Sequence, residues 1–129
     1  MNADKDIFRF QRLDIWHRST QFADAIYQVT ESFPRKEVFG LTSQLRRAAV
    51  SISANIAEGS SRASNKEFSR FVEIAYGSLC ETVSHLKIAK SQRMIVEDQF
   101  FQLWNEAQQL ARMLSSFRNS LGSWKTKAE

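Results

Sequence analysis

The residues in this chain that could support metal chemistry are few and poorly spaced for it. Each of the two histidines has one carboxylate nearby: Asp14 lies three positions before His17, and Glu81 lies four positions before His85. A di-iron or di-manganese site in a helical bundle needs two Glu-x-x-His segments and two further glutamates. Because the sequence does not supply that set, we interpret both histidines as surface or boundary residues, and we expect no metal and no other cofactor.

Cysteine chemistry has as little support. Cys80 is the single cysteine, and the neighbouring Glu81 opposes formation of a thiolate. A nucleophile needs an activating base or a positive environment, and no His, Lys or Arg lies within one helical turn of Cys80. We therefore expect a structural or interface role for Cys80, no catalytic residues, and a protein that is not an enzyme. A lone cysteine and a polar N-terminal segment fit a cytoplasmic protein with no membrane partner.

The residues best suited to binding are basic. Residues 35–93 carry ten Lys and Arg against five Glu, so the net charge of +4 comes from the middle of the chain. Within this segment five positions are candidates for nucleic-acid contact: Arg46, Arg47, Arg62, Lys66 and Arg70. The last three follow one another at four-residue spacing, which places them on one face if the helix there starts early enough.

Two interpretations of these five residues remain open. They could pair with carboxylates such as Glu58 and Glu73, or bond between subunits, because Arg is well suited to interface ion pairs. Alternatively, they contact the phosphate backbone of RNA or DNA, in a way that depends on salt and little on sequence. No recognition-helix, RRM, KH or zinc-finger pattern predicts base-specific readout.

Apolar periodicity predicts the helices that position these residues. One Pro and four Gly among 129 residues favour long helices, and the pattern predicts four of them, over residues 10–33, 37–58, 65–91 and 96–121. Helices of this length joined by short loops predict an all-α fold, an antiparallel up-down-up-down four-helix bundle in one domain. The bundle would occupy residues 10–122, between an N-terminal arm (1–9) and a disordered tail (123–129).

Turn and cap residues set the expected helix ends. Pro34 is expected to end the first helix, and Gly59 is expected to stop the second in a left-handed conformation. Ser64 and Glu67 have the spacing of a capping box for the third helix. Gly122 is expected to close the fourth.

Each predicted helix has an apolar stripe that we expect in the core. In the first helix the stripe consists of Leu13, Trp16, Thr20, Ala23, Tyr27 and Thr30. In the second it consists of Val38, Leu41, Leu45, Ala48, Ala49, Ile52 and Ile56. The third and fourth helices have longer stripes: Phe68, Phe71, Val72, Ala75, Leu79, Val83, Leu86 and Ala89, then Phe100, Leu103, Trp104, Ala107, Leu110, Ala111, Leu114, Phe117 and Leu121. Phe8, Phe10 and Trp124 lie outside or at the edge of a stripe, and we expect them to pack over an end of the bundle.

The second helix also carries an unusual outward side. A solvated helix back normally shows Glu, Lys and Gln, whereas here the residues are small and nearly uncharged: Gly40, Ser43, Arg47, Val50, Ser51, Ala54 and Ala57. Small residues let another backbone approach closely. We therefore predict that this side is an interface between subunits of a homo-oligomer.

Several segments of the chain resemble the bacterial four helix bundle protein family, also known as the 23S ribosomal RNA intervening-sequence proteins. The resemblance covers about residues 10–120. The segments that carry it are Leu13-Asp14-Ile15-Trp16, Phe33-Pro34, Gly40-Leu41, QLRRAAVSI (44–52), NIAEG (55–59), EFSRF (67–71) and AYGSL (75–79). The chain has Ser53 where the family usually has Pro, so a helix kink there would be softer, and Val83 where a Glu is common.

The resemblance implies a small cytoplasmic bundle that assembles as a ring, a pentamer. The chain is also similar to the accessory variability protein of diversity-generating retroelements, a basic pentameric barrel that binds a reverse transcriptase and nucleic acid. The family supplies no catalytic residues. We therefore expect a non-enzymatic, homo-oligomeric protein that binds the backbone of RNA or DNA. The alternatives are a protein–protein scaffold, or accessory subunit, with no direct nucleic-acid binding, and a metal-binding bundle.

Overall fold

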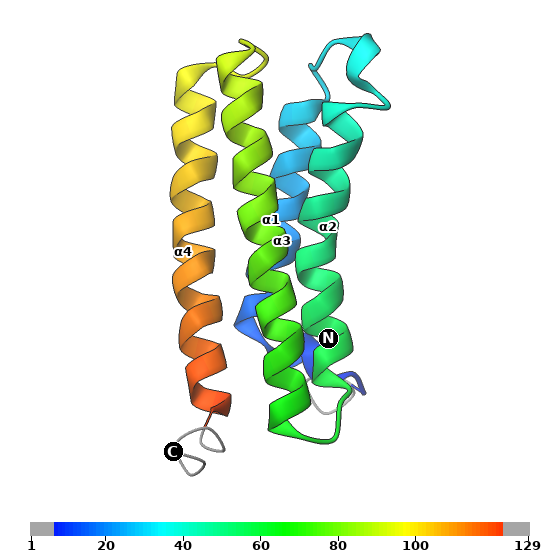
Figure 1. The fold of residues 1–129 in the computed structure, drawn as a ribbon, viewed down its shortest axis with the longest axis vertical. Coiled ribbons are helices and arrows are strands. Elements are labelled where there is room, and N and C mark those ends of the chain that lie inside the picture. Colours follow the sequence, from blue (N-terminus) through cyan, green and yellow to red (C-terminus); the bar gives the residue numbers. More distant parts are fainter. Residues whose placement is uncertain (1–6, 123–129) are drawn as a thin grey trace.

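A computed structural model describes residues 7–122, which form four long helices and two short 3-10 turns (Figure 1). Each long helix packs against the next along the chain, and the first also packs against the last. This confirms the all-α four-helix bundle. The elements are η2 (Arg9–Arg12), α1 (Asp14–Thr30), η3 (Arg35–Glu37), α2 (Leu41–Ser60), α3 (Asn65–Ser91) and α4 (Glu97–Leu121). The predicted tail (123–129) and most of the predicted arm (1–9) lie outside the described residues.

The first helix is shorter at both ends than the sequence predicted. Residues 9–12 form the 3-10 turn η2, and Leu13 is extended (φ −99°, ψ 121°), so α1 begins only at Asp14. At the other end the helix stops at Thr30, and the Phe33 N–H bonds to the Thr30 carbonyl in a tight turn. Phe33 precedes Pro34, which disfavours helical backbone at that position.

The second helix begins later than predicted, at Leu41 instead of residue 37. Residues 35–37 form η3, a separate turn that does not continue the phase of α2. As a result Val38 is half exposed (50%), and the prediction that it continues the core stripe was wrong. Leu41, the next member of that stripe, is buried.

The prediction that Gly59 stops α2 in a left-handed conformation was also wrong. The helix runs on to Ser60, and no described glycine has a positive φ. Gly59 is buried, and a Cβ atom at this position would lie 2.6 Å from Phe71 Cβ and 2.9 Å from Phe68 Cδ1. Gly59 is therefore needed for the close approach of α2 to α3.

The core face of α1 is rotated from the predicted stripe. The buried residues of this helix are Ile15, Ser19, Phe22, Ala23, Ile26, Val29 and Thr30, whereas Tyr27 is 43% exposed. Ser19 fits the core because its hydroxyl donates to the Ile15 carbonyl at 2.6 Å. In α3 and α4, by contrast, every predicted core residue is buried or half-buried.

The helix ends near the α2–α3 turn follow simple cap chemistry. Ser64 precedes α3 in an extended conformation, and its hydroxyl accepts the Glu67 N–H at 3.1 Å, which is the predicted N-cap bond. Gly122 follows α4, and its N–H donates to the Asn119 carbonyl.

No helix within residues 7–122 is long and apolar enough to cross a membrane.

Candidate interaction surface

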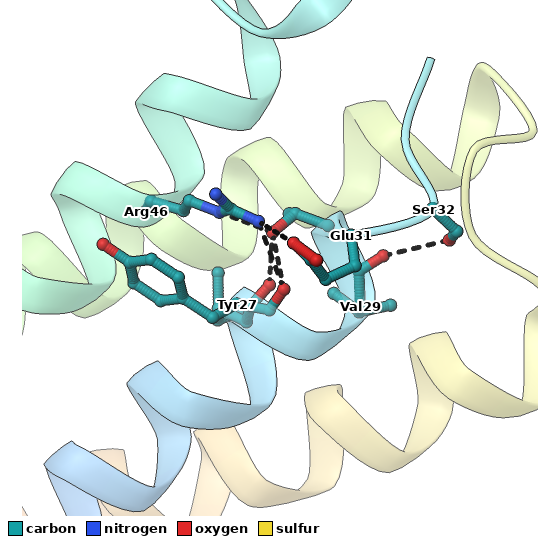
Figure 2. A network of polar contacts seen from close by, with 7 residues as sticks. Tyr27, Val29, Glu31, Ser32 and Arg46 are labelled. Carbon is teal, nitrogen blue, oxygen red and sulfur yellow. Dashed lines mark hydrogen bonds and ion pairs between the residues drawn. The ribbon is translucent and has the colours of Figure 1, made fainter. Parts of the chain in front are cut away.

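The Arg46 side chain connects α2 to the C-terminal end of α1, as Figure 2 shows. Its Nε donates to the Thr30 hydroxyl at 2.9 Å, and its Nη2 lies 3.3 Å from the Tyr27 carbonyl and 3.2 Å from a Glu31 carboxylate oxygen. The guanidinium also stacks on the Tyr27 ring, 4.5 Å from its centroid. All of these partners belong to the same chain, so Arg46 has a structural role within the bundle.

Arg47 is exposed and makes no hydrogen bond or ion pair with another residue in the described range 7–122. It lines an open groove of about 610 Å³ that runs along the outer side of α2, with Tyr27 of α1 and Val38 at its edge. Four other residues of the predicted subunit interface line the same groove: Ser43, Val50, Ser51 and Ala54. The predicted outward face of α2 is therefore hollowed, and its surface is largely small and apolar.

The two remaining interface candidates lie beyond this groove. Gly40 is the half-buried residue that precedes α2, and Ala57 is half-buried one turn after Ala54. Ser51 faces partly toward α3, because its hydroxyl and that of Ser78 form a hydrogen bond at 2.9 Å. Along α2 the exposed face is therefore centred on Arg47, Val50 and Ala54.

Arg62 lies in the turn between α2 and α3, before the first residue of α3. Its Nη2 forms an ion pair with Glu58 at 3.0 Å, and its guanidinium stacks on the Phe71 ring at 4.8 Å. The pairing with Glu58 is one of the contacts that the structural interpretation predicted. Both charged groups remain partly exposed to solvent.

Lys66 and Arg70 lie one turn apart in the first part of α3, and both are exposed. Arg70 makes no hydrogen bond or ion pair with any residue between 7 and 122. The three-residue basic ridge predicted from four-residue spacing is thus only partly helical, since Arg62 belongs to the turn. The three residues are nevertheless grouped at one end of the bundle.

The structure adds Arg9, which was not among the five predicted binding residues, to this group. The turn η2 packs against α2 at the same end, and the Arg9 guanidinium lies 4.9 Å from the centroid of the Phe68 ring, at the start of α3. Arg9, Arg62, Lys66 and Arg70 together form what we call the basic end (Figure 1, the end with the α2–α3 turn). No spacing rule could have found Arg9, because it reaches this end through the 3-10 turn.

The five predicted binding residues therefore fall into two groups. Ser60 lies fourteen positions after Arg46 in α2, which corresponds to about 20 Å at 1.5 Å per residue. Arg46 and Arg47 lie toward the start of α2, whereas Arg62, Lys66 and Arg70 lie beyond its end. A single small binding surface therefore cannot include both the Arg46 group and the Arg62 group.

The histidines and aromatic residues make local contacts. His17 Nε2 lies 2.7 Å from the Gln11 carbonyl oxygen, and His85 Nε2 lies 3.3 Å from a Glu81 carboxylate oxygen. Phe10 packs against Trp16, with ring centroids 4.7 Å apart, while Trp124 lies outside the described residues. Within residues 7–122 no group of three or more His, Cys, Asp or Glu residues is placed to hold a metal ion.

The four packed helices of the described residues 7–122 define a helical bundle, with a groove on the outer face of α2 and a group of basic residues at one end. The chain belongs to the 23S rRNA-intervening sequence protein family, whose family model matches residues 11–116. It is similar to a crystal structure from Bacteroides thetaiotaomicron, described as a protein with unknown function from the S23 ribosomal protein family. The two share 24% identity and a TM-score of 0.72, over 81% of this chain and 97% of that one. No curated protein matches the chain.

Proposed function

We propose that this protein is a non-enzymatic, self-associating bundle that binds the phosphate backbone of RNA or DNA through the basic end. The observation that carries the proposal is the convergence of four cationic side chains from three segments. Arg9 comes from η2, Arg62 from the α2–α3 turn, and Lys66 and Arg70 from α3. These segments are held against one another by the same helix packing that forms the core.

The contacts at the basic end favour a partner with negative charge. Arg9 and Arg70 form no ion pair with a carboxylate in the range 7–122, so their charges are available to a ligand. Arg62 forms an ion pair with Glu58, which reduces the contribution of Arg62 to anion binding. Guanidinium groups bind phosphate oxygens with paired hydrogen bonds, and the resulting affinity falls as salt rises.

The same end offers little for reading bases. Phe68 is completely buried, and Phe71 is half-buried beneath Arg62. Aromatic rings that stack on unpaired bases must be exposed. The proposed binding is therefore to the backbone, with little sequence preference.

A charge-reversed variant tests this assignment. We expect Arg62→Glu/Lys66→Glu/Arg70→Glu to lose RNA and DNA binding while it keeps its helical content and its mass in solution. The matched control is Arg35→Glu/Lys36→Glu/Arg93→Glu, which changes the charge by the same amount at exposed positions in the α1–α2 and α3–α4 connections, at the opposite end of the bundle. Equal loss in both variants would mean that net charge alone matters, and unchanged binding in the first would remove these residues from the site.

A second candidate function, a protein–protein scaffold or accessory subunit, is favoured by the groove on α2. In this case the groove and Arg47 serve assembly or dock another protein, such as a reverse transcriptase, and the protein does not touch nucleic acid itself. Arg47→Glu is then expected to break the assembly, since it places a carboxylate on an apolar contact face. An Arg47→Glu protein that stays folded and assembled would contradict that role.

A further inference from the structure

We propose that the Phe39 side chain of one copy occupies the groove on α2 of a second copy. The inference depends on the self-association proposed above and identifies the contact that produces it. It rests on two features of the described surface. One is an exposed aromatic ring on a fixed backbone, and the other is a groove whose walls suit such a ring.

Phe39 is the most exposed large apolar residue in the described range, at 94%. Its backbone is nevertheless held on both sides: before it, the Val38 N–H donates to the Arg35 carbonyl at 3.1 Å. The Gly40 N–H donates to the Glu37 carbonyl at 2.9 Å, and the Leu41 N–H donates to the Glu37 carboxylate at 3.1 Å. A phenylalanine side chain has a large apolar area whose removal from water is favourable. Phe39 is not isolated, because the adjacent Val38 and the exposed Val50 line one groove, and grouped apolar side chains of this kind indicate a surface that becomes covered.

The groove has the chemistry that an aromatic ring requires. Tyr27 lines the groove together with Arg46, whose guanidinium stacks on the Tyr27 ring, and Val50 and Ala54 supply apolar surface. The Arg47 guanidinium, which has no ion-pair partner among residues 7–122, lines the same groove. A guanidinium over the face of an aromatic ring is a favourable cation–π contact, and two aromatic rings prefer offset or edge-to-face packing. At about 610 Å³ the groove is large enough for the ring and its neighbours.

A second copy of the chain is the occupant that the structure favours. Val38 lines the groove, yet the adjacent Phe39 of the same chain stays in solvent, so the ring does not fill its own groove. Every copy carries both the ring and the groove on neighbouring surface. One aromatic ring buries about 150–250 Å², and a specific interface needs about 800 Å² per partner, so the small residues along α2 supply the remaining contact.

Two variants that damage opposite halves of this contact test the proposal. Phe39→Ala removes the ring, and Val50→Trp fills the groove. We expect each variant to weaken self-association by about 10-fold or more, as for a central interface residue, while circular dichroism shows unchanged helix content. The matched controls are Phe101→Ala and Ile74→Trp, which alter half-exposed apolar residues on α4 and α3, outside the groove, and are expected to keep the wild-type mass.

Mixing the two variants gives the sharpest result. The Phe39→Ala chain keeps an intact groove and the Val50→Trp chain keeps an intact ring, so the mixture is expected to form a 1:1 complex in native mass spectrometry. A Phe39→Ala protein with the wild-type mass would overturn the inference and leave self-association standing. A wild-type protein that is monomeric at all concentrations would overturn both this inference and the proposed self-association. If Phe39→Ala lost RNA binding with its assembly intact, the ring would contact nucleic acid and the inference would be wrong.

Discussion

Gly59 in α2 and Phe71 in α3 lie so close that a Cβ atom at position 59 would be 2.6 Å from the Cβ of Phe71. Nonbonded carbon atoms prefer a separation of about 3.5–4.0 Å. Glycine is therefore required here by the distance between two helices, and the backbone of Gly59 itself is ordinary helix. This close approach brings the α2–α3 turn and the start of α3, with their basic residues, into their observed positions.

Substitution of Gly59 by alanine is expected to destabilise the bundle. The added methyl group would meet both Phe71 and Phe68, and overpacking of this kind costs about 1–3 kcal/mol. The matched control is Gly77→Ala in α3, where no atom lies within 4 Å of the added Cβ, and there the change should stabilise by about 0.5–1 kcal/mol. Urea unfolding measures both effects. A Gly59→Ala protein as stable as the wild type would show that α2 and α3 separate without cost.

Arg46 and Arg47 are neighbours with opposite expected effects on stability. Arg46→Ala removes the contacts to Thr30, Tyr27 and Glu31, which we expect to lower the free energy of unfolding by about 1–2 kcal/mol. Arg47→Ala removes no hydrogen bond or ion pair within the described part of the chain, so its effect on a dilute, dissociated sample is expected to be below about 0.5 kcal/mol. Urea unfolding again gives the comparison. Equal effects on the free energy of unfolding would contradict the structural role assigned to Arg46.

Ser64→Ala tests the start of α3. Loss of the hydroxyl leaves the Glu67 N–H without its cap, and the expected cost is about 1 kcal/mol. Ser84→Ala is the control, because Ser84 is exposed in the middle of the same helix and alanine is the better helix former there. If thermal unfolding gave the two variants the same midpoint, the cap bond would have no measurable role.

The sequence predicted α3 and α4 well, because their apolar residues form one uninterrupted stripe each. In α1 the predicted Thr30 is buried, but so is Ser19, which the predicted stripe left out and whose hydroxyl bonds back to the Ile15 carbonyl. Tyr27 was predicted to be buried, but it lies under Arg46 at the surface. The Ser19 error arises because hydrogen bonding within a helix makes a small polar residue compatible with burial, and the Tyr27 error follows from the rotated core face of α1.

The candidate site could be predicted only in part. The choice of Arg62, Lys66 and Arg70 follows from their spacing, and the structure places them together at one end of the bundle. Sequence spacing could not distinguish Arg46, which is bound to the C-terminal end of α1, from Arg47, which is not. Arg9 was missed because its position over Phe68 depends on the turn η2, which has no apolar period.

The most direct test of nucleic-acid binding by the basic end is a salt titration of wild-type binding to structured RNA, single-stranded RNA and duplex DNA. If the four cations of the basic end each contact a phosphate, affinity should fall roughly 50- to 150-fold between 50 and 200 mM salt. The charge-reversed variant Arg62→Glu/Lys66→Glu/Arg70→Glu should lose both the binding and this dependence. No binding by folded wild-type protein at 50 mM salt, or binding that does not change with salt, would contradict the assignment of the basic end to nucleic acid.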